Sequence, residues 1–448
     1  MIRRLGDYFT RIMENYLPDA YLFAILLTFL SAVLALIFTP KGFMDVILAW
    51  GNGIWNLLAF SMQMVLILVT GHTLALTPPV KRFLNWIASL AKTPAAAVAI
   101  VALVAGAASW IQWGFGLIIG GLLALEMAKR MKVVDFPLLV AAAYGGFLVW
   151  HMGLSGSIPL TIASKGNPAN YVEKLAGWVV PSGQTIFAGW NFLPAILLIL
   201  TIPIVLYYAH PSPEKAKLVE AAVLAGLTEE KRPEKPALTT WAQKIENSVL
   251  VNYLFALMGV AYLIDYFARK GFSLDLNIVI TFFLFLGIIL HQTPINYVQA
   301  VNQAIRGAGG IVLQFPLYAG IQGIMMGTGL ASVIAGWFVA ISNSHTFYLL
   351  QFWAAGLINM FIPSGGGQWA AQGSISVMAA QKMNLDVTKT AMMVAWGDQW
   401  TNMIQPFWAL PLLGLANLKA RDIMGYTTLV LLWGGVVMSI AALVMASS

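Results

Sequence analysis

Apolar stretches of about 20 residues recur along almost the whole chain and are separated by short polar loops. A helix of this length can cross the hydrocarbon core of a bilayer, where no water is available to hydrogen-bond the backbone. The strict alternation typical of membrane β-barrels is absent, so we predict helices. About nine spans are predicted, at residues 20–38, 54–76, 136–163, 186–208, 248–267, 276–290, 309–330, 390–412 and 426–445.

Two further apolar stretches, 94–131 and 346–383, are each about twice as long as one span at the helical rise of ~1.5 Å per residue. Glycine and polar residues interrupt both near the middle, as SWIQWGFG at 109–116 and PSGGGQ at 363–368. We predict a re-entrant hairpin in each: two half-helices that enter the membrane and return to the same side. With the N-terminus in the cytoplasm, this topology places most of the 25 Lys and Arg residues in cytoplasmic loops, as the positive-inside rule expects.

The order of elements occurs twice along the chain. Each copy runs span, span, short interfacial segment, hairpin, broken span, span, and Met131 and Met383 mark the offset (383 − 131 = 252). Five crossings separate the copies, so they are inverted relative to each other, an arrangement typical of secondary transporters with a site near the midplane. The predicted fold class is an all-α polytopic membrane protein with two inverted repeats, re-entrant helical hairpins and broken transmembrane helices.

The predicted domain organisation follows from this order. Its parts are a cytoplasmic amphipathic lead-in (1–19), a first repeat (20–209) with hairpin 94–131, a charged cytoplasmic linker (210–247), a linking span (248–267), and a second repeat (268–448) with hairpin 346–383.

Composition agrees with a membrane protein and excludes several functions. The chain is 59% hydrophobic and only 10% charged, whereas soluble domains carry about 25% charged residues. Its net charge of +7 lies in short loops rather than on one face, so we expect no nucleic-acid partner. There is no cysteine, which excludes disulfides and thiolate chemistry. Without a zinc-protease, P-loop, serine-hydrolase or dinucleotide motif, we expect no enzyme and no organic cofactor.

The hairpin tips are the predicted substrate site. Consecutive glycines let the backbone turn sharply, and the half-helix that follows points free N–H groups into the tip, where an anion is stabilised. Close helix packing is the alternative reason for the glycines. The predicted substrate-binding residues are Ser109, Gln112, Gly114, Gly116, Ser364, Gly365, Gly366, Gly367 and Gln368, with His151 and Ser155 of the first broken span.

Asp398, in the second broken span, is the predicted coupling residue. A carboxyl group at mid-membrane depth is costly when ionised and unpaired, so it is a candidate proton carrier or cation ligand. The alternative is a structural Asp that caps a half-helix, and His151 is equally compatible with a packing role. The ion-coupling candidates are Asp398, Gln399, Thr401, Asn402, Gly145 and Gly146, with Gln405 as another neutral hydrogen-bonding group and Na⁺ near Asp398 as the candidate metal.

Four long motifs resemble the bacterial short-chain fatty acid transporter family, within the ion transporter superfamily. They are YLPDAYLFA (16–24), HMGLSGSIPL (151–160), FIPSGGGQWAAQGSI (361–375) and WGDQWTNMIQPFWALPLLG (396–414), and the likeness spans essentially the whole chain.

The resemblance implies uptake of short-chain fatty acids of the acetoacetate and butyrate class across the bacterial inner membrane. It also implies coupling to H⁺ or Na⁺, an elevator-type motion and a homodimer in contact with membrane lipid. Alternatives within the superfamily are a cation/proton antiporter and a dicarboxylate transporter. Since no Arg or Lys is predicted near the midplane, a small monocarboxylate is favoured over a multiply charged substrate.

Overall fold

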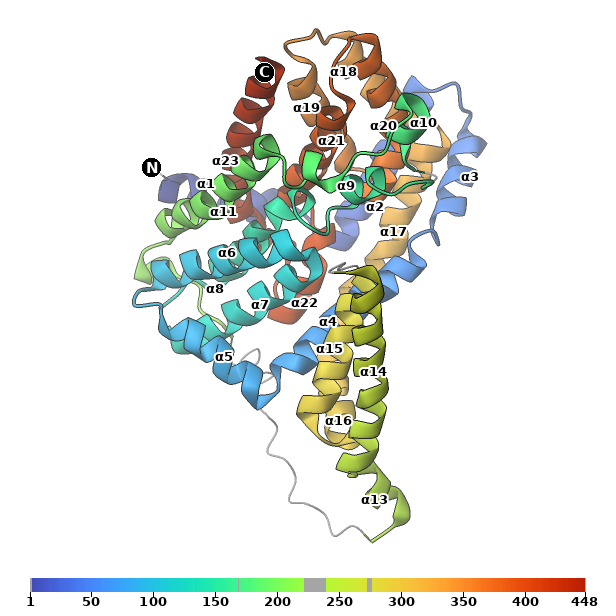
Figure 1. Ribbon diagram of the computed structural model, residues 1–448. Coiled ribbons are helices and arrows are strands. Elements are labelled where there is room, and N and C mark those ends of the chain that lie inside the picture. The colour runs from blue at the N-terminus through green and yellow to red at the C-terminus, as the bar shows by residue number, and fades with distance from the viewer. Residues whose placement is uncertain (1, 132, 168, 221–238, 272–275, 448) are drawn as a thin grey trace.

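The computed structural model describes residues 2–131, 133–167, 169–220, 239–271 and 276–447, which form helices joined by turns and loops and contain no strand (Figure 1). Residues 221–238 of the predicted linker 210–247 lie outside the described residues. Within these described residues, eight segments are long and apolar enough to cross a membrane. The predicted all-helical membrane architecture is confirmed.

The eight segments differ from the predicted spans at three places. Pro94–Ile111, the first half of the predicted hairpin, is itself long enough to cross. The predicted span 276–290 corresponds to α15 (Leu276–His291), a helix of only 16 residues. The predicted span 390–412 is divided between α21 (Val387–Thr401) and α22 (Leu410–Ala416), so no part of it reaches the length of a full crossing.

The helices of the N-terminal half begin where capping residues end the preceding loops. Thr93 and Asp135 each accept a hydrogen bond from the backbone two or three residues into the helix, and a proline stands at the start of both helices. The half consists of α1 (Ile2–Tyr16), α2 (Ala20–Phe38), α3 (Phe43–Gly53), α4 (Leu58–Ala75), α5 (Pro78–Ser89), α6 (Pro94–Ile111), α7 (Trp113–Arg130), α8 (Phe136–Gly145), the 3₁₀ helix η1 (Gly146–Met152), α9 (Ser157–Ile162), α10 (Tyr171–Ala176) and α11 (Gly189–Ala209).

The C-terminal half repeats this order. It contains α13 (Trp241–Glu246), α14 (Val249–Lys270), α15, α16 (Pro294–Ala304), α17 (Gly309–Gly327), α18 (Leu330–Ala340), α19 (Phe347–Asn359), α20 (Gly365–Lys382), α21, the 3₁₀ helices η5 (Asn402–Ile404) and η6 (Phe407–Ala409), α22 and α23 (Ala420–Ser447). Helices α3 and α16 begin 251 residues apart (294 − 43), and α7 and α20 begin 252 apart (365 − 113). The repeat is therefore present in the spacing of the helices as well as in their order.

One hydrogen bond joins equivalent positions of the two repeats. Trp150 Nε1 donates to Asn402 Oδ1 at 3.1 Å, and the two residues are 252 positions apart, which is the repeat offset. The two broken spans therefore meet at this hydrogen bond.

Helices α14, α15 and α16 form an arm that projects from one end of the molecule (Figure 1). The arm is held to α4, since His291 Nε2 lies 2.9 Å from Thr73 O and Gln63 Nε2 donates to Asn277 Oδ1 at 2.7 Å. At the other side of the molecule the N-terminal helix α1 docks on α23, where Gly6 lies against Leu429.

The broken spans lie at the centre of the protein. In the segment Phe136–Ile162, which contains α8, η1 and α9, 94% of the residues of its most apolar window are buried inside the protein. Irregular backbone is tolerated at membrane depth only when protein or an aqueous cavity surrounds it. The centre of the fold can therefore hold polar groups that lipid would not.

Candidate functional site

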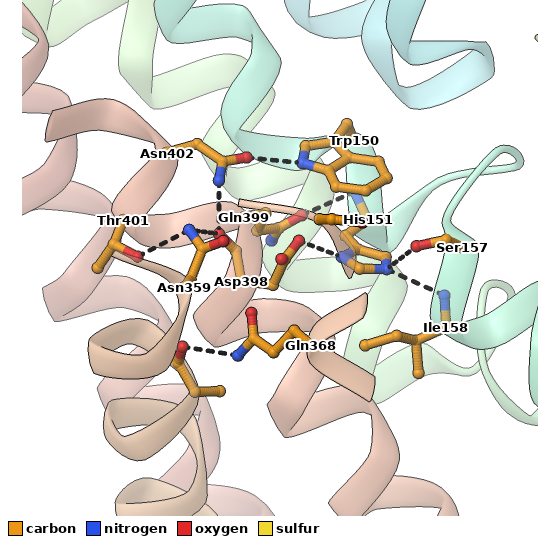
Figure 2. A network of polar contacts seen from close by, with 12 residues as sticks. Trp150, His151, Ser157, Ile158, Asn359, Gln368, Asp398, Gln399, Thr401 and Asn402 are labelled. Atoms are coloured by element: carbon orange, nitrogen blue, oxygen red, sulfur yellow. Dashed lines mark hydrogen bonds and ion pairs between the residues drawn. The ribbon is translucent and has the colours of Figure 1, made fainter. Parts of the chain in front are cut away.

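The candidate site is a polar network where the two broken spans meet (Figure 2). His151, from η1, and Asp398, near the end of α21, face each other with Nδ1 and Oδ2 2.8 Å apart. Both side chains are fully buried. The sequence separates them by 247 residues, so only the packing of the two repeats brings them together.

Two glycines at the junction of α8 and η1 allow close packing against neighbouring helices. A side chain at Gly146 would come within 2.4 Å of the backbone nitrogen of Gly106 in α6, so the two backbones can approach this closely only at glycine. Gly145 is likewise close to Val430 of α23. The two predicted ion-coupling glycines thus allow helices to pack closely and position the 3₁₀ segment that carries His151.

Hydrogen bonds determine the tautomer of His151. The backbone N–H of Ile158 donates to Nε2 at 3.0 Å, and the Ser157 hydroxyl lies 3.0 Å from the same nitrogen. Because a backbone amide can only donate, Nε2 is the unprotonated acceptor and Nδ1 carries the proton that is donated to Asp398. His151 is therefore neutral in this conformation. Protonation of Nε2 would require the first turn of α9 to move away.

The predicted neighbours of Asp398 surround it but are engaged by the protein. Gln399 Oε1 accepts a hydrogen bond from the His151 backbone at 2.9 Å, and Asn402 Nδ2 donates to Asp398 O at 2.9 Å. Thr401 Oγ1 donates to Gly356 O at 2.8 Å. The Asp398 side chain contacts an imidazole rather than a helix N-terminus, so helix capping does not explain its presence.

The tip of the second hairpin packs against His151 and Ser157. A Cβ at Gly365 would lie 2.4 Å from both His151 Cε1 and Ser157 Oγ, so glycine is the residue that fits. Ser364 Oγ accepts from Gly367 N–H at 3.3 Å and caps α20. Among the described residues, the amides of Gly365 and Gly366 have no acceptor, and Gly366 is exposed. Two N–H groups are therefore available to an anion beside His151.

Gln368 is oriented differently from the other predicted tip residues. Its Nε2 donates to Ala355 O of α19 at 2.7 Å, and its side chain is fully buried. In this conformation its donor group is thus used within the hairpin rather than offered at the tip.

The tip of the first hairpin has the same backbone but is closed. Gln112 (φ −152°, ψ 121°) matches Ser364 (φ −153°, ψ 110°), and its Oε1 accepts from Phe115 N–H at 2.6 Å. Ser155 Oγ accepts from Trp113 N–H at 3.1 Å, and Gly116 leaves room for Ser109. Ser109, Gln112, Gly114 and Gly116 are all buried. The loop after η1 therefore satisfies this tip, whereas the second tip stays open.

Comparisons with known proteins identify the family. The sequence profile of the short chain fatty acid transporters matches residues 1–445. The chain belongs to this family. A protein of Escherichia coli K12 is 42% identical over 98% of both chains, and one of Haemophilus influenzae Rd is 42% identical over 95% of this chain and 96% of its own. Both carry short-chain fatty acid transporter as a provisional name. The predicted membership is confirmed.

Two solved transporters show a distant structural likeness. The Alcanivorax borkumensis YdaH transporter is 15% identical with a TM-score of 0.41, covering 94% of this chain and 98% of its own. The Neisseria gonorrhoeae antimetabolite efflux pump MtrF is 14% identical with a TM-score of 0.41, covering 98% and 97%.

Two polar residues near the site, Asn359 and Gln322, were not predicted from the sequence. Asn359, at the end of α19, donates from Nδ2 to Asp398 O at 2.7 Å and to Thr401 Oγ1 at 3.0 Å. Gln322 of α17 reaches the second tip, where a Cβ on Gly367 would lie 2.2 Å from its Nε2. Both are single polar residues in apolar runs. That pattern was the available signal, but it does not reveal which residues they meet.

A groove leads from the surface to Gln322. It has a volume of about 390 Å³ and lies between α3 and α17. Its lining includes Lys41, Asp45, Asn52, Asn56 and Gln322. The groove therefore reaches the residue that touches the second tip.

Proposed function

We propose that this protein is a secondary transporter that carries short-chain fatty acids of the acetoacetate and butyrate class across the bacterial inner membrane, driven by H⁺ or Na⁺. Family membership supports the substrate class. The observation that carries the mechanism is the contact of the Gly365 tip with His151, which in turn pairs with Asp398.

The second hairpin tip supplies an anion site suited to a monocarboxylate. Free amides at Gly365 and Gly366, at the start of α20, stabilise one carboxylate through hydrogen bonds and the helix dipole. The Gln322 amide lies against Gly367 of the tip, and Gln322 also lines the groove between α3 and α17. No Arg or Lys lies among the described residues that contact the tip, and a dicarboxylate would need a second cationic partner.

Asp398 links the carboxylate to a cation. An ionised Asp398 next to the tip repels an anionic substrate, so substrate binding becomes favourable once a proton or metal ion neutralises the carboxylate. His151 transmits the change because one of its nitrogens contacts Asp398 and the other contacts the residues that touch Gly365. Cation and carboxylate therefore move together.

The proposal extends to the larger motion. Both hairpins, taken as re-entrant, and both broken spans would form a transport part that moves in an elevator-like way. The arm α14–α16 with α4 would belong to a static part that pairs with a second copy, and the N-terminus would lie in the cytoplasm. The separate packing of the arm against α4 supports this division.

Uptake into proteoliposomes tests the proposal. Labelled butyrate and acetoacetate should accumulate against an imposed pH or Na⁺ gradient, and Asp398→Asn should abolish accumulation because its side chain can neither bind a proton nor carry charge. Asp265→Asn is the matched control, since Asp265 is exposed and forms an ion pair with Arg269 at the surface of α14.

Three results would contradict the proposal. Normal accumulation in Asp398→Asn would remove the coupling role. Cation exchange without carboxylate flux would identify an antiporter. Preference for succinate over butyrate would identify a dicarboxylate transporter.

A further inference from the structure

The end of α19 is surrounded by side-chain oxygens that accept no hydrogen bond from the described chain. These are Asn359 Oδ1, Gln368 Oε1, Asp398 Oδ1 and Gln405 Oε1, and all four side chains are fully buried. Buried polar atoms without a partner are uncommon and each calls for an explanation. Here four oxygens from one small region share the same condition.

The orientation of the three amides is determined by their other ends. Asn359 Nδ2 donates to Asp398 O, Gln368 Nε2 donates to Ala355 O at 2.7 Å, and Gln405 Nε2 donates to Asn359 O at 3.3 Å. Rotating any of these amides by 180° would place two oxygens against each other, so the assignment of oxygen and nitrogen is secure. Each amide nitrogen therefore donates to the protein, whereas the three amide oxygens and Asp398 Oδ1 accept no hydrogen bond from the described chain.

Hydrogen bonds connect three of these residues, because Asn359 donates to the Asp398 backbone and Gln405 donates to the Asn359 backbone. Figure 2 shows the oxygen end of the Gln368 amide turned toward the side on which Asp398 lies, and Asn359 beside the Asp398 backbone. The Gln405 amide joins them through its bond to Asn359 O. The last turn of α19 points its carbonyl groups at the same region, and the C-terminal end of a helix favours positive charge.

Such an arrangement suits a cation rather than an anion. An anion needs donors, but the free atoms here are oxygens, which are the ligands of hard cations. One carboxylate and three neutral amides balance a single positive charge, whereas a divalent ion requires more carboxylates. No group of three or more His, Cys, Asp or Glu side chains comes together in the described part of the chain, so a transition-metal site is not favoured.

We propose that Asp398, Asn359, Gln368 and Gln405 bind Na⁺. This inference rests on the proposed function for its role as the coupling site, and it assigns Gln368 to the cation rather than to the substrate. The predicted neighbours Gln399, Thr401 and Asn402 serve as structural supports, because their side chains already bond the protein. Sodium thus sits behind the tip whose amides face the substrate, and its charge offsets that of Asp398.

Sodium binding can be measured without substrate. A ligand that binds only the folded state raises the unfolding temperature with its concentration. Purified protein is unfolded in increasing NaCl, with choline chloride holding the ionic strength constant and KCl as the comparison. We expect NaCl alone to raise the Tm, and Gln368→Leu and Asn359→Ala to weaken the apparent affinity at least tenfold.

The matched control is Gln381→Leu. Gln381 lies on the same helix, is exposed, and donates from Nε2 to Leu175 O at 3.0 Å, so the substitution removes the same kind of bond far from the site. It should respond to NaCl as the wild type does. Should Gln368→Leu or Asn359→Ala not fold, Asp398→Asn keeps the shape and removes the charge, and it should lose the sodium response.

Several outcomes overturn the assignment. Equal effects of NaCl, KCl and choline chloride would mean that protons or buried water satisfy the oxygens. Equal effects of NaCl and KCl would remove selectivity for sodium, and a wild-type response in the site variants would place the ion elsewhere. None of these bears on butyrate uptake driven by a pH gradient, so a failed sodium site and a failed transport proposal are distinguishable.

Discussion

Gly365→Ala tests whether transport requires the second hairpin tip to contact His151, the partner of Asp398. The added Cβ would lie 2.4 Å from His151 Cε1 and from Ser157 Oγ, whereas ordinary contact begins at 3.4 Å, so about 1.0 Å must be gained (3.4 − 2.4). His151 cannot easily yield, because both ring nitrogens are engaged and its ring stacks on Trp150 with centroids 4.0 Å apart. The tip itself must therefore move.

The cost can be estimated from overpacking. Inserting a methyl group into a well-packed site costs about 1–3 kcal/mol. If that cost falls on the state in which the tip contacts His151, the fraction of protein in that state drops by roughly 5- to 150-fold. Initial butyrate uptake by proteoliposomes should fall by a similar factor, while the unfolding temperature changes little because the tip can lift without unfolding α20.

Gly336→Ala is the control for this experiment. Gly336 lies in the neighbouring helix α18 and has nothing within 4 Å of the position of a Cβ. The same chemical change should therefore leave uptake near the wild-type rate. Wild-type uptake by Gly365→Ala would refute the reasoning, since it would show that transport does not require this contact.

Two further predictions concern stability. Gly116→Ala places a Cβ 2.6 Å from Ser109 Cα and 2.5 Å from the Ser109 backbone nitrogen, so it should destabilise the protein toward the upper end of about 1–3 kcal/mol. Thermal unfolding measures this loss against the control Gly51→Ala, whose Cβ would meet open space. Equal Tm values for the two variants would contradict the prediction. Burial lowers the pKa of His210 below its ordinary value of 6.5, so the stability that neutral His210 contributes is complete above that pH and is lost as the pH falls below it. The drop in Tm from about pH 7.5 to about pH 5.5 should therefore be smaller in His210→Gln than in the wild type. An unchanged drop would show that His210 does not cause this pH dependence.

His210 lies outside the spans and hydrogen-bonds two other segments of the chain. Its Nε2 accepts from Asp135 N–H at 3.3 Å, where Asp135 caps α8, and its carbonyl accepts from Arg3 Nε at 2.7 Å. Protonation of Nε2 would remove the acceptor for the Asp135 amide. The start of the first broken span is thus tied to the N-terminal helix through this one residue.

The sequence by itself determined the helical membrane architecture and the positions of the breaks. Long apolar runs can fold only as helices in lipid, and glycine with polar residues at 109–116 and 363–368 interrupts them wherever the rest of the protein lies. Helix α6 ends at Ile111, and α20 begins at Gly365 after its cap Ser364. Asp398 was also identifiable, since an ionisable group in such a run is costly unless it has a function.

Only the tertiary structure decided what each polar residue does. In a helix that is apolar on all sides, periodicity does not distinguish the face toward lipid from the face toward protein. The sequence therefore could not show that His151 faces Asp398, that Ser155 closes the first tip, or that the amide of Gln368 turns toward α19. These relations join segments up to 247 residues apart, and they depend on how the two repeats pack against each other.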